Sequence, residues 1–179
     1  GQEESWRTGA DQVAAALKKH LWDDEKGACF DKDRFGNGMP TLTHNNLRCM
    51  YWGSFSKEMA DRFVREHLLN PQEFWTPMPL VSVAANDPDF RNAPENNWSG
   101  QCEGLTFQRA MHALERYGYE QLVTRLGGRF LDVQKIAAGD LQRQHRSLCH
   151  DRRIVTKNLS AAKATLVLPQ QLGAFLVLI

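Results

Sequence analysis

The strongest constraint on the fold is a pair of helical repeats with almost no sequence between them. Over residues 100–118, apolar side chains recur at the three- and four-residue spacing of an α-helix: Phe107, Ala110, Met111, Leu114 and Tyr117. Gly118 then ends the repeat, because glycine readily takes the left-handed conformation that closes a helix. A second repeat over residues 119–133 begins at once. The sequence therefore predicts an antiparallel helical hairpin.

Three earlier segments show the same spacing. Residues 9–22, 44–52 and 56–69 each place apolar side chains along one helical face. Ser56 is a suitable N-cap for the third segment, and Asn70-Pro71 stops it. Strand signal is scarce, so we predict an all-α fold built from helix pairs.

One long segment interrupts the helices. Residues 70–99 have no helical period and contain five prolines and four large aromatic residues, Phe74, Trp75, Phe90 and Trp98. Such long connections in compact domains are usually functional, and the aromatic content predicts that this one is ordered. Indoles stack on the C–H faces of sugars, and amides and carboxylates bind their hydroxyls. The same composition also fits aromatic residues that plug the core and polar residues that satisfy loop backbone.

Composition excludes several classes of function. A net charge of +1 over 179 residues gives no electrostatic reason to expect nucleic acid or an anionic membrane as a partner. No apolar run approaches the roughly 20 residues of a membrane span, and the first residues do not read as a signal peptide. The four cysteines lack a C-x-x-C pair, which favours reduced thiols and a cytoplasmic setting. Asp31-x-Asp33 begins like a calcium loop without completing one, so we expect no metal and no cofactor.

The chain changes character after about residue 135. Residues 136–179 contain six Lys or Arg and two Asp, a local charge of +4, and end in a bare apolar run. We predict that residues 1–135 belong to the folded domain and that residues 136–179 form an atypical basic tail. Three interpretations of the tail stay open: a functional basic segment, a poorly packed or disordered terminus, or a segment not native to the fold.

Two stretches resemble a known group of enzymes. The order FWTPMPLVSVAANDPDF … NNWSGQCEGLTFQRAMHALERYGY is similar to glycoside hydrolase families 63 and 37 and to the mannosylglycerate-hydrolase-like domain. The upstream LWDDEKGACFDKD resembles the hairpin of the same families. The matching residues are Leu21, Trp22, Gly27, Phe30, Asp31, Pro79, Ser82, Val83, Ala84, Asp87, Pro88, Phe90, Asn97, Trp98, Gly100, Ala113, Leu114, Tyr117 and Gly118. The resemblance covers about residues 6–134.

The resemblance implies an incomplete (α/α)6 toroid of antiparallel helical hairpins with one long ordered loop. A full toroid has twelve helices, and this sequence predicts about five, so the missing N-terminal part of the barrel is an expected partner. The catalytic acid of such enzymes is generally an Asp on an earlier helix, before Gly1. Gly100-Gln101-Cys102-Glu103 replaces the usual Gly-Pro-x-Trp, and the downstream Y-N-x-x-T-G segment is absent from the tail.

Glu103 is the candidate catalytic carboxylate, because it heads the apolar stripe of the first hairpin helix. It also sits where a helix favours Glu as a cap, which is the competing interpretation. The expected sugar-binding residues are Trp75, Asp87, Asn97, Trp98 and Gln101. The resemblance implies hydrolysis of an O-glycosidic bond, with inversion, on an α-glucoside or mannoside, although this fragment alone is not expected to suffice. The alternatives are a sugar isomerase or epimerase on the same toroid, and a non-catalytic carbohydrate-binding fragment.

Overall fold

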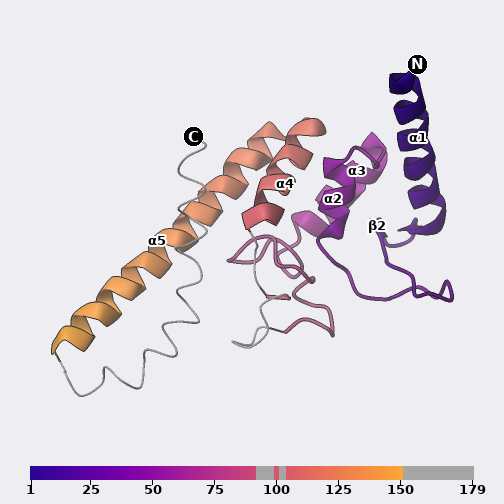
Figure 1. Ribbon diagram of the computed structural model, residues 1–179. Coiled ribbons are helices and arrows are strands. Elements are labelled where there is room, and N and C mark those ends of the chain that lie inside the picture. Colours follow the sequence, from indigo (N-terminus) through magenta and orange to yellow (C-terminus); the bar gives the residue numbers. More distant parts are fainter. Residues whose placement is uncertain (92–98, 101–103, 151–179) are drawn as a thin grey trace. The chain divides into compact units, whose positions relative to one another are not determined.

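The computed structural model describes residues 1–91, 99–100 and 104–150 (Figure 1). The chain divides into two compact units, Gly1–Phe130 and a second that begins at Leu131. The elements in chain order are α1 (Gln2–His20), β1 (Trp22–Asp23), β2 (Ala28–Cys29), α2 (Asn45–Tyr51), α3 (Lys57–Phe63), the π-helical turn η1 (Val64–Leu68), α4 (Gly104–Arg116) and α5 (Glu120–His150). The described chain is thus mostly helical, as the sequence predicts.

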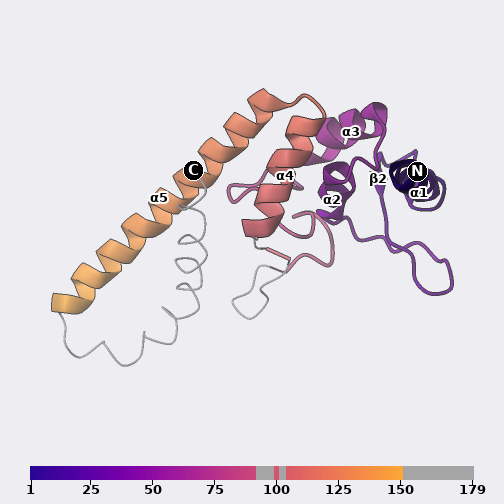
Figure 2. The ribbon, with the colours of Figure 1, turned by 45° about the horizontal axis from the view of Figure 1, so that its top comes forward.

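One part of the core of the first unit lies where α2 packs against α4 (Figure 2), and the same cluster continues into α3, η1, the long loop and α5. Leu47 and Met50 of α2 are fully buried, as are Ala110, Ala113 and Leu114 of α4. The two alanines leave room for the helices to approach closely, and the larger side chains fill the space beside them. The apolar face predicted for α4 is therefore the face that the fold buries.

The predicted helical hairpin is present in α4 and the first turns of α5. Gly118 has φ +81°, the left-handed conformation that its position requires. The backbone N–H of Tyr119 donates to the carbonyl of Leu114 at 2.9 Å, which closes the end of α4. The ring of Phe107 stacks on that of Phe130, 4.4 Å between centroids, so the early part of α4 meets a later part of α5. This contact is the antiparallel pairing that the sequence predicts.

The helix boundaries differ from the prediction in three places. Helix α1 begins at Gln2 rather than near residue 9, because Glu3 and Glu4 suit the positive pole of its first turn. The predicted helix over 56–69 consists of α3 and the π-helical turn η1, with the expected cap: Ser56 Oγ accepts from the N–H of Met59 at 3.2 Å. Helix α5 does not end near residue 133 but continues to His150. The change of composition at residue 135 therefore does not break the helix.

A short β-hairpin follows α1, at the segment that carries the upstream resemblance. Trp22 pairs with Cys29 and Asp23 with Ala28, and Gly27 at φ +68° allows the turn. The side chain of Asn46, buried in α2, accepts from the N–H of Cys29 at 2.7 Å and donates to its carbonyl at 3.1 Å. The side-chain amide of Asn46 has both a donor and an acceptor, so it bonds the backbone of Cys29 in the way that a neighbouring strand would. The hairpin is thereby linked to the core helix α2.

Helix α1 has a different environment from the other helices of the first unit. None of its residues is buried, and Trp6 and Val13 are 79% and 61% exposed. Its contacts are with β1, and only Leu17 of its apolar stripe packs against the core. The stripe over Ala10, Val13, Ala14 and Leu17 therefore lies mostly uncovered in the described part of the chain.

Candidate functional site

Two of the six predicted site residues, Trp75 and Asp87, lie in the described part of the chain. Asn97, Trp98, Gln101 and Glu103 lie outside the described residues, so their placement stays a prediction. The structure describes instead both flanks of the segment that contains them. These flanks are residues 70–91 on one side and Ser99, Gly100 and α4 on the other.

Trp75 is held between the long loop and α5. Its side chain is only 8% exposed, and the guanidinium groups of Arg125 and Arg129 lie 5.4 and 5.0 Å from its ring centroid. Arg129 also donates from Nη2 to the carbonyl of Thr76 at 2.9 Å. Cations over an indole face are attracted by its ring electrons, so this arrangement fixes the ring. The indole of Trp75 therefore stabilises the path of the loop.

Asp87 organises the loop at its other arm. Its Oδ2 accepts from the N–H of Leu42 at 2.9 Å, and its Oδ1 accepts from the N–H of Asp89 at 2.9 Å. Asp89 in turn accepts from the hydroxyl of Thr41 at 2.6 Å. Charged acceptors form the stronger hydrogen bonds in proteins. Two carboxylates thus join the strand-like segment before α2 to the long loop.

A small backbone frame surrounds the gap in the described chain. The N–H groups of Ser82 and Val83 both donate to the carbonyl of Ser99, at 3.0 and 3.2 Å. The hydroxyl of Ser99 donates to the carbonyl of Arg91 at 2.6 Å and accepts from its N–H at 2.7 Å. Thr43 forms a β-bridge with Val83. The two ends of the predicted sugar-binding segment are thereby fixed to one another.

Leu80, in the same loop, has an unusual backbone. Its φ of +62° lies in the left-handed region, which a leucine rarely adopts, yet its side chain is fully buried. Its N–H donates to the carbonyl of Phe74 at 3.1 Å, which closes the turn beside Trp75. Residues held in such strained conformations cluster at functional sites. The strain favours this loop as the functional one.

His44 lies beside the backbone frame and is uncharged at neutral pH. Its N–H donates to the carbonyl of Ser82 at 3.0 Å, and its side-chain Nδ1 is buried without a hydrogen-bond partner. Burial, together with the nearby charge of Arg48, lowers the pKa of His44 to about 4. A neutral ring is the cheaper form to bury when its nitrogen has no acceptor. His44 thus lies beside the backbone frame as an uncharged ring.

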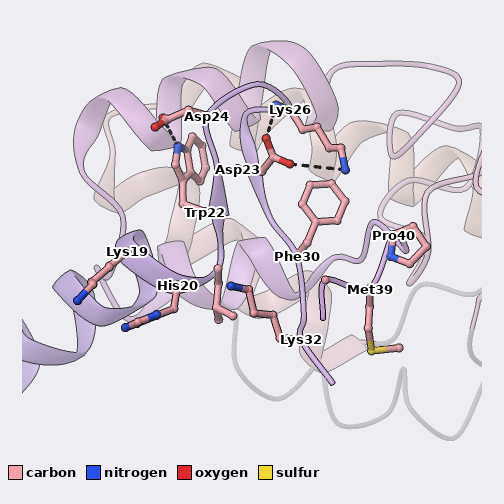
Figure 3. A pocket seen from close by; sticks show the side chains of 12 residues that line it. Lys19, His20, Trp22, Asp23, Asp24, Lys26, Phe30, Lys32, Met39 and Pro40 are labelled. Carbon is pink, nitrogen blue, oxygen red and sulfur yellow. Dashed lines mark hydrogen bonds and ion pairs between the residues drawn. The ribbon is translucent and has the colours of Figure 1, made fainter. Parts of the chain in front are cut away.

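A hollow of about 490 Å³ opens beside the β-hairpin, between the end of α1 and residues 32–40 (Figure 3). Trp22 and Phe30 line it, and both are residues of the motif that carries the upstream resemblance. Its two carboxylates are engaged: Asp24 accepts from the indole N–H of Trp22 at 2.7 Å, and Asp23 pairs with Lys26 at 3.5 Å. Sequence reasoning identified these residues as a motif but did not predict a cavity there.

Two further features of the described ranges bear on function. No group of three or more His, Cys, Asp or Glu side chains there is arranged to hold a metal ion. In those same ranges, no helix has both the length and the apolar character needed to cross a membrane.

Solved structures with a similar fold are glycosidases. The neutral trehalase Nth1 from Saccharomyces cerevisiae aligns with a TM-score of 0.68 at 22% identity, over 76% of this chain and 24% of that chain. The GH63 mannosylglycerate hydrolase from Thermus thermophilus, in complex with glucose, aligns with a TM-score of 0.58 at 22% identity, over 68% of this chain and 30% of that chain. The chain therefore has the fold of part of an (α/α)6 toroid, and it spans less than a third of the length of these two structures.

The family follows from the sequence itself. The family model of the mannosylglycerate hydrolase MGH1-like glycoside hydrolase domain matches residues 1–147, most of the chain. The chain belongs to that family, as its motifs predict. A comparison with the curated proteins finds no match.

Proposed function

We propose that this chain forms part of a glycosidase that hydrolyses an O-glycosidic bond. The observation that carries the proposal is the family match over residues 1–147, which includes both the hairpin and the long loop. The toroid fold supports it, because the similar structures are a trehalase and a mannosylglycerate hydrolase. Fold alone does not determine function, so the weight rests on the family and on the loop.

The proposed substrate is a carbohydrate, of the α-glucoside or mannoside type. The names of the two similar enzymes and the glucose bound in one of them support this class. We propose that Asn97, Trp98 and Gln101 contact the sugar. Trp75 and Asp87 then shape the site through the contacts described above, since the first is covered by arginines and the second accepts from backbone N–H groups.

For catalysis we propose Glu103, the residue immediately before α4, as the base that activates water. Hydrolysis with inversion needs a second carboxyl group on the other side of the sugar, about 6.5–9.5 Å away. The remaining helices of the barrel are the proposed source of that acid. The division at residue 135 likewise stays a prediction, with residues 1–135 as catalytic domain and residues 136–179 as tail.

The test uses a protein in which this chain is joined to the rest of its barrel. Glu103→Gln should lower kcat on a model α-glucoside or mannoside by about 10²–10⁴-fold, because general acid–base catalysis contributes that much. Glu115→Gln is the matched control, since the side chain of Glu115 is exposed on α4 and pairs with His112. Unchanged turnover in Glu103→Gln would remove its catalytic role.

The same assay separates the two alternatives. Glucose binding without turnover, in both the parent protein and the variants, would favour a carbohydrate-binding role. An isomerised or epimerised sugar in place of a cleaved glycoside, identified by proton NMR of the product, would favour the isomerase. A free sugar of inverted anomeric configuration supports the proposal.

A further inference from the structure

His67 occupies an unusual position for a histidine. It lies in the π-helical turn η1, and it is only 9% exposed. Both of its ring nitrogens make short hydrogen bonds: Nδ1 is 2.6 Å from Oε2 of Glu73, and Nε2 is 2.6 Å from the carbonyl oxygen of Lys26. π-helical turns are rare and frequently found at functional sites. His67 is therefore a buried polar residue whose ring joins two other segments of the chain.

The chemistry of the two partners determines the number of protons. A backbone carbonyl only accepts, and an ionised carboxylate only accepts, so both ring nitrogens must donate. A neutral imidazole carries one N–H and satisfies only one of the two. Both bonds therefore form at the same time only when the pair carries a second proton, either on the ring opposite an ionised Glu73 or on Glu73 opposite a neutral ring.

The two bonds connect three segments. Lys26 is in the turn of the β-hairpin, His67 is in η1, and Glu73 is at the start of the long loop. The carbonyl of Glu73 also accepts from the N–H of Ala85 at 3.1 Å, which brings in the second arm of the loop, next to Asp87. The ring of His67 thus links the hairpin turn to Glu73, and the carbonyl of Glu73 links it to the second arm of the loop.

The other charged groups near this turn already have partners. Arg62 donates to the carbonyl of Asp24 at 2.7 Å and pairs with Glu66 at 3.2 Å, and Arg65 also pairs with Glu66. The ammonium group of Lys26 pairs with the carboxylate of Asp23 and not with the imidazole of His67. Among the described residues, Glu73 is therefore the charged group in hydrogen-bond contact with His67.

We propose that His67 is a positioning residue whose two ring hydrogen bonds, to Glu73 and to the carbonyl of Lys26, hold the long loop against the hairpin. Loss of either bond releases one of the two segments, so the loop and the hairpin turn loosen together. The inference rests on the proposed function only for what the loop binds. The coupling between the loop and the hairpin can be measured without any substrate.

The direct readout is nitrogen-15 NMR of the histidine rings in the complete chain, with hydrogen exchange of backbone amides. In the wild type, the His67–Glu73 pair should show protons at both His67 ring nitrogens or a proton shared with the carboxyl group. Glu73→Gln removes the charge, and its amide N–H can donate to Nδ1 of a neutral ring, so the ring should carry one proton while both bonds remain. Glu73→Ala leaves Nδ1 without this partner, so exchange should accelerate about tenfold or more at Ala85 in the loop and at Gly27 in the hairpin turn.

The chain contains a matched control. His112 and Glu115 form a pair of the same chemistry at 3.1 Å, but their side chains are 57% and 50% exposed. Glu115→Gln should leave exchange at Ala85 and Gly27 unchanged. A distant effect on the hairpin turn from a loop substitution would not follow from a local packing role of Glu73.

Two results would overturn the inference. One is a wild-type His67 ring with a single proton and an ionised Glu73. The other is a Glu73→Ala or His67→Gln chain in which exchange at Gly27 and Ala85 matches the wild type. Glucose titration separates the positioning role of His67 from the proposed function. If the loop and the hairpin are coupled but no sugar binds, the result counts against the proposed function alone. If sugar binds but the loop and the hairpin are not coupled, the result counts against the role of His67 alone.

Discussion

Helices α1 and α4 have similar amphipathic sequences, but the fold buries the apolar face of α4 and leaves that of α1 exposed. Each carries an apolar stripe at helical spacing and basic residues in its last turn. Helix α4 buries Ala110, Ala113 and Leu114 completely, whereas α1 buries nothing. Amphipathicity therefore specifies that a face is to be covered, but not which part of the protein covers it.

The exposed apolar face of α1 agrees with the length of the chain, which is much shorter than the similar solved structures. It aligns with 24–30% of the similar solved structures, and a toroid buries each helix against neighbours from adjacent hairpins. Helix α4 finds α2 and α5 within the described chain, while α1 contacts β1. We propose that further helices of the barrel cover the stripe of α1.

The largest expected effect comes from truncating one residue on each face. Leu114→Ala, in the buried face of α4, should lower the free energy of unfolding by about 2–5 kcal/mol, because it removes transfer energy and leaves a cavity. Val13→Ala, in the exposed face of α1, should change it by less than about 0.5 kcal/mol. Denaturant unfolding of the two variants measures both. Equal losses would mean that α1 is packed in solution and would break the comparison.

A second prediction concerns how the free energy of unfolding depends on pH, through His44 at the start of α2. The folded-state pKa of His44, about 4, lies below the ordinary value of 6.5, so the unfolded chain binds more protons between these values. The contribution of His44 is present above pH 6.5 and is lost as the pH falls toward 4. Its full size is about 3 kcal/mol, at about 1.4 kcal/mol for each pKa unit. Urea unfolding at a series of pH values measures the slope.

His44→Gln serves as the control for this prediction, because glutamine does not titrate. The variant should unfold with a shallower dependence on pH over the same interval, while His112→Gln, on the exposed side of α4, should keep the slope of the wild type. An unchanged slope in His44→Gln would assign the acid sensitivity to another group.

The smallest effect concerns helix ends. Ser56 caps α3, which carries the buried Met59, Ala60 and Phe63, so Ser56→Ala should cost about 1 kcal/mol. Ser5→Ala, in the first turn of the exposed helix α1 but not at its cap, should be neutral or slightly stabilising, because alanine has the higher helix propensity. Thermal unfolding followed by circular dichroism compares the two. A larger loss for Ser5→Ala would contradict the assignment of the core to the α2–α4 side.

Much of the fold was predictable because its signals are local. The stripe around Phe107 and Leu114, the cap at Ser56 and the glycine at 118 each act within one or two helical turns. The hairpin at residues 22–29 was identified through its motif. The extent of α5 was not predicted, because the composition changes near residue 135 and the helix does not end there.

The contacts that matter most for the site were beyond sequence reasoning. Asn46 bonds Cys29 across 17 positions, and His67 bonds Lys26 across 41. No local pattern encodes such pairs, because they depend on how separately formed segments meet. The candidate residues Trp75 and Asp87 were correctly placed on one loop, but the arginines over Trp75 come from α5 and give no signal near it.

Hydrogen exchange of the backbone amides, compared between α1 and α4 in this chain, tests the central claim most directly. Because most of the stability of a helix in a protein comes from the packing of its apolar face, the unburied α1 should exchange much faster than α4, whose amides around Ala110 and Leu114 exchange with the protection of global unfolding. Protection of α1 equal to that of α4 would contradict the claim, since it would mean that the stripe of α1 is already covered.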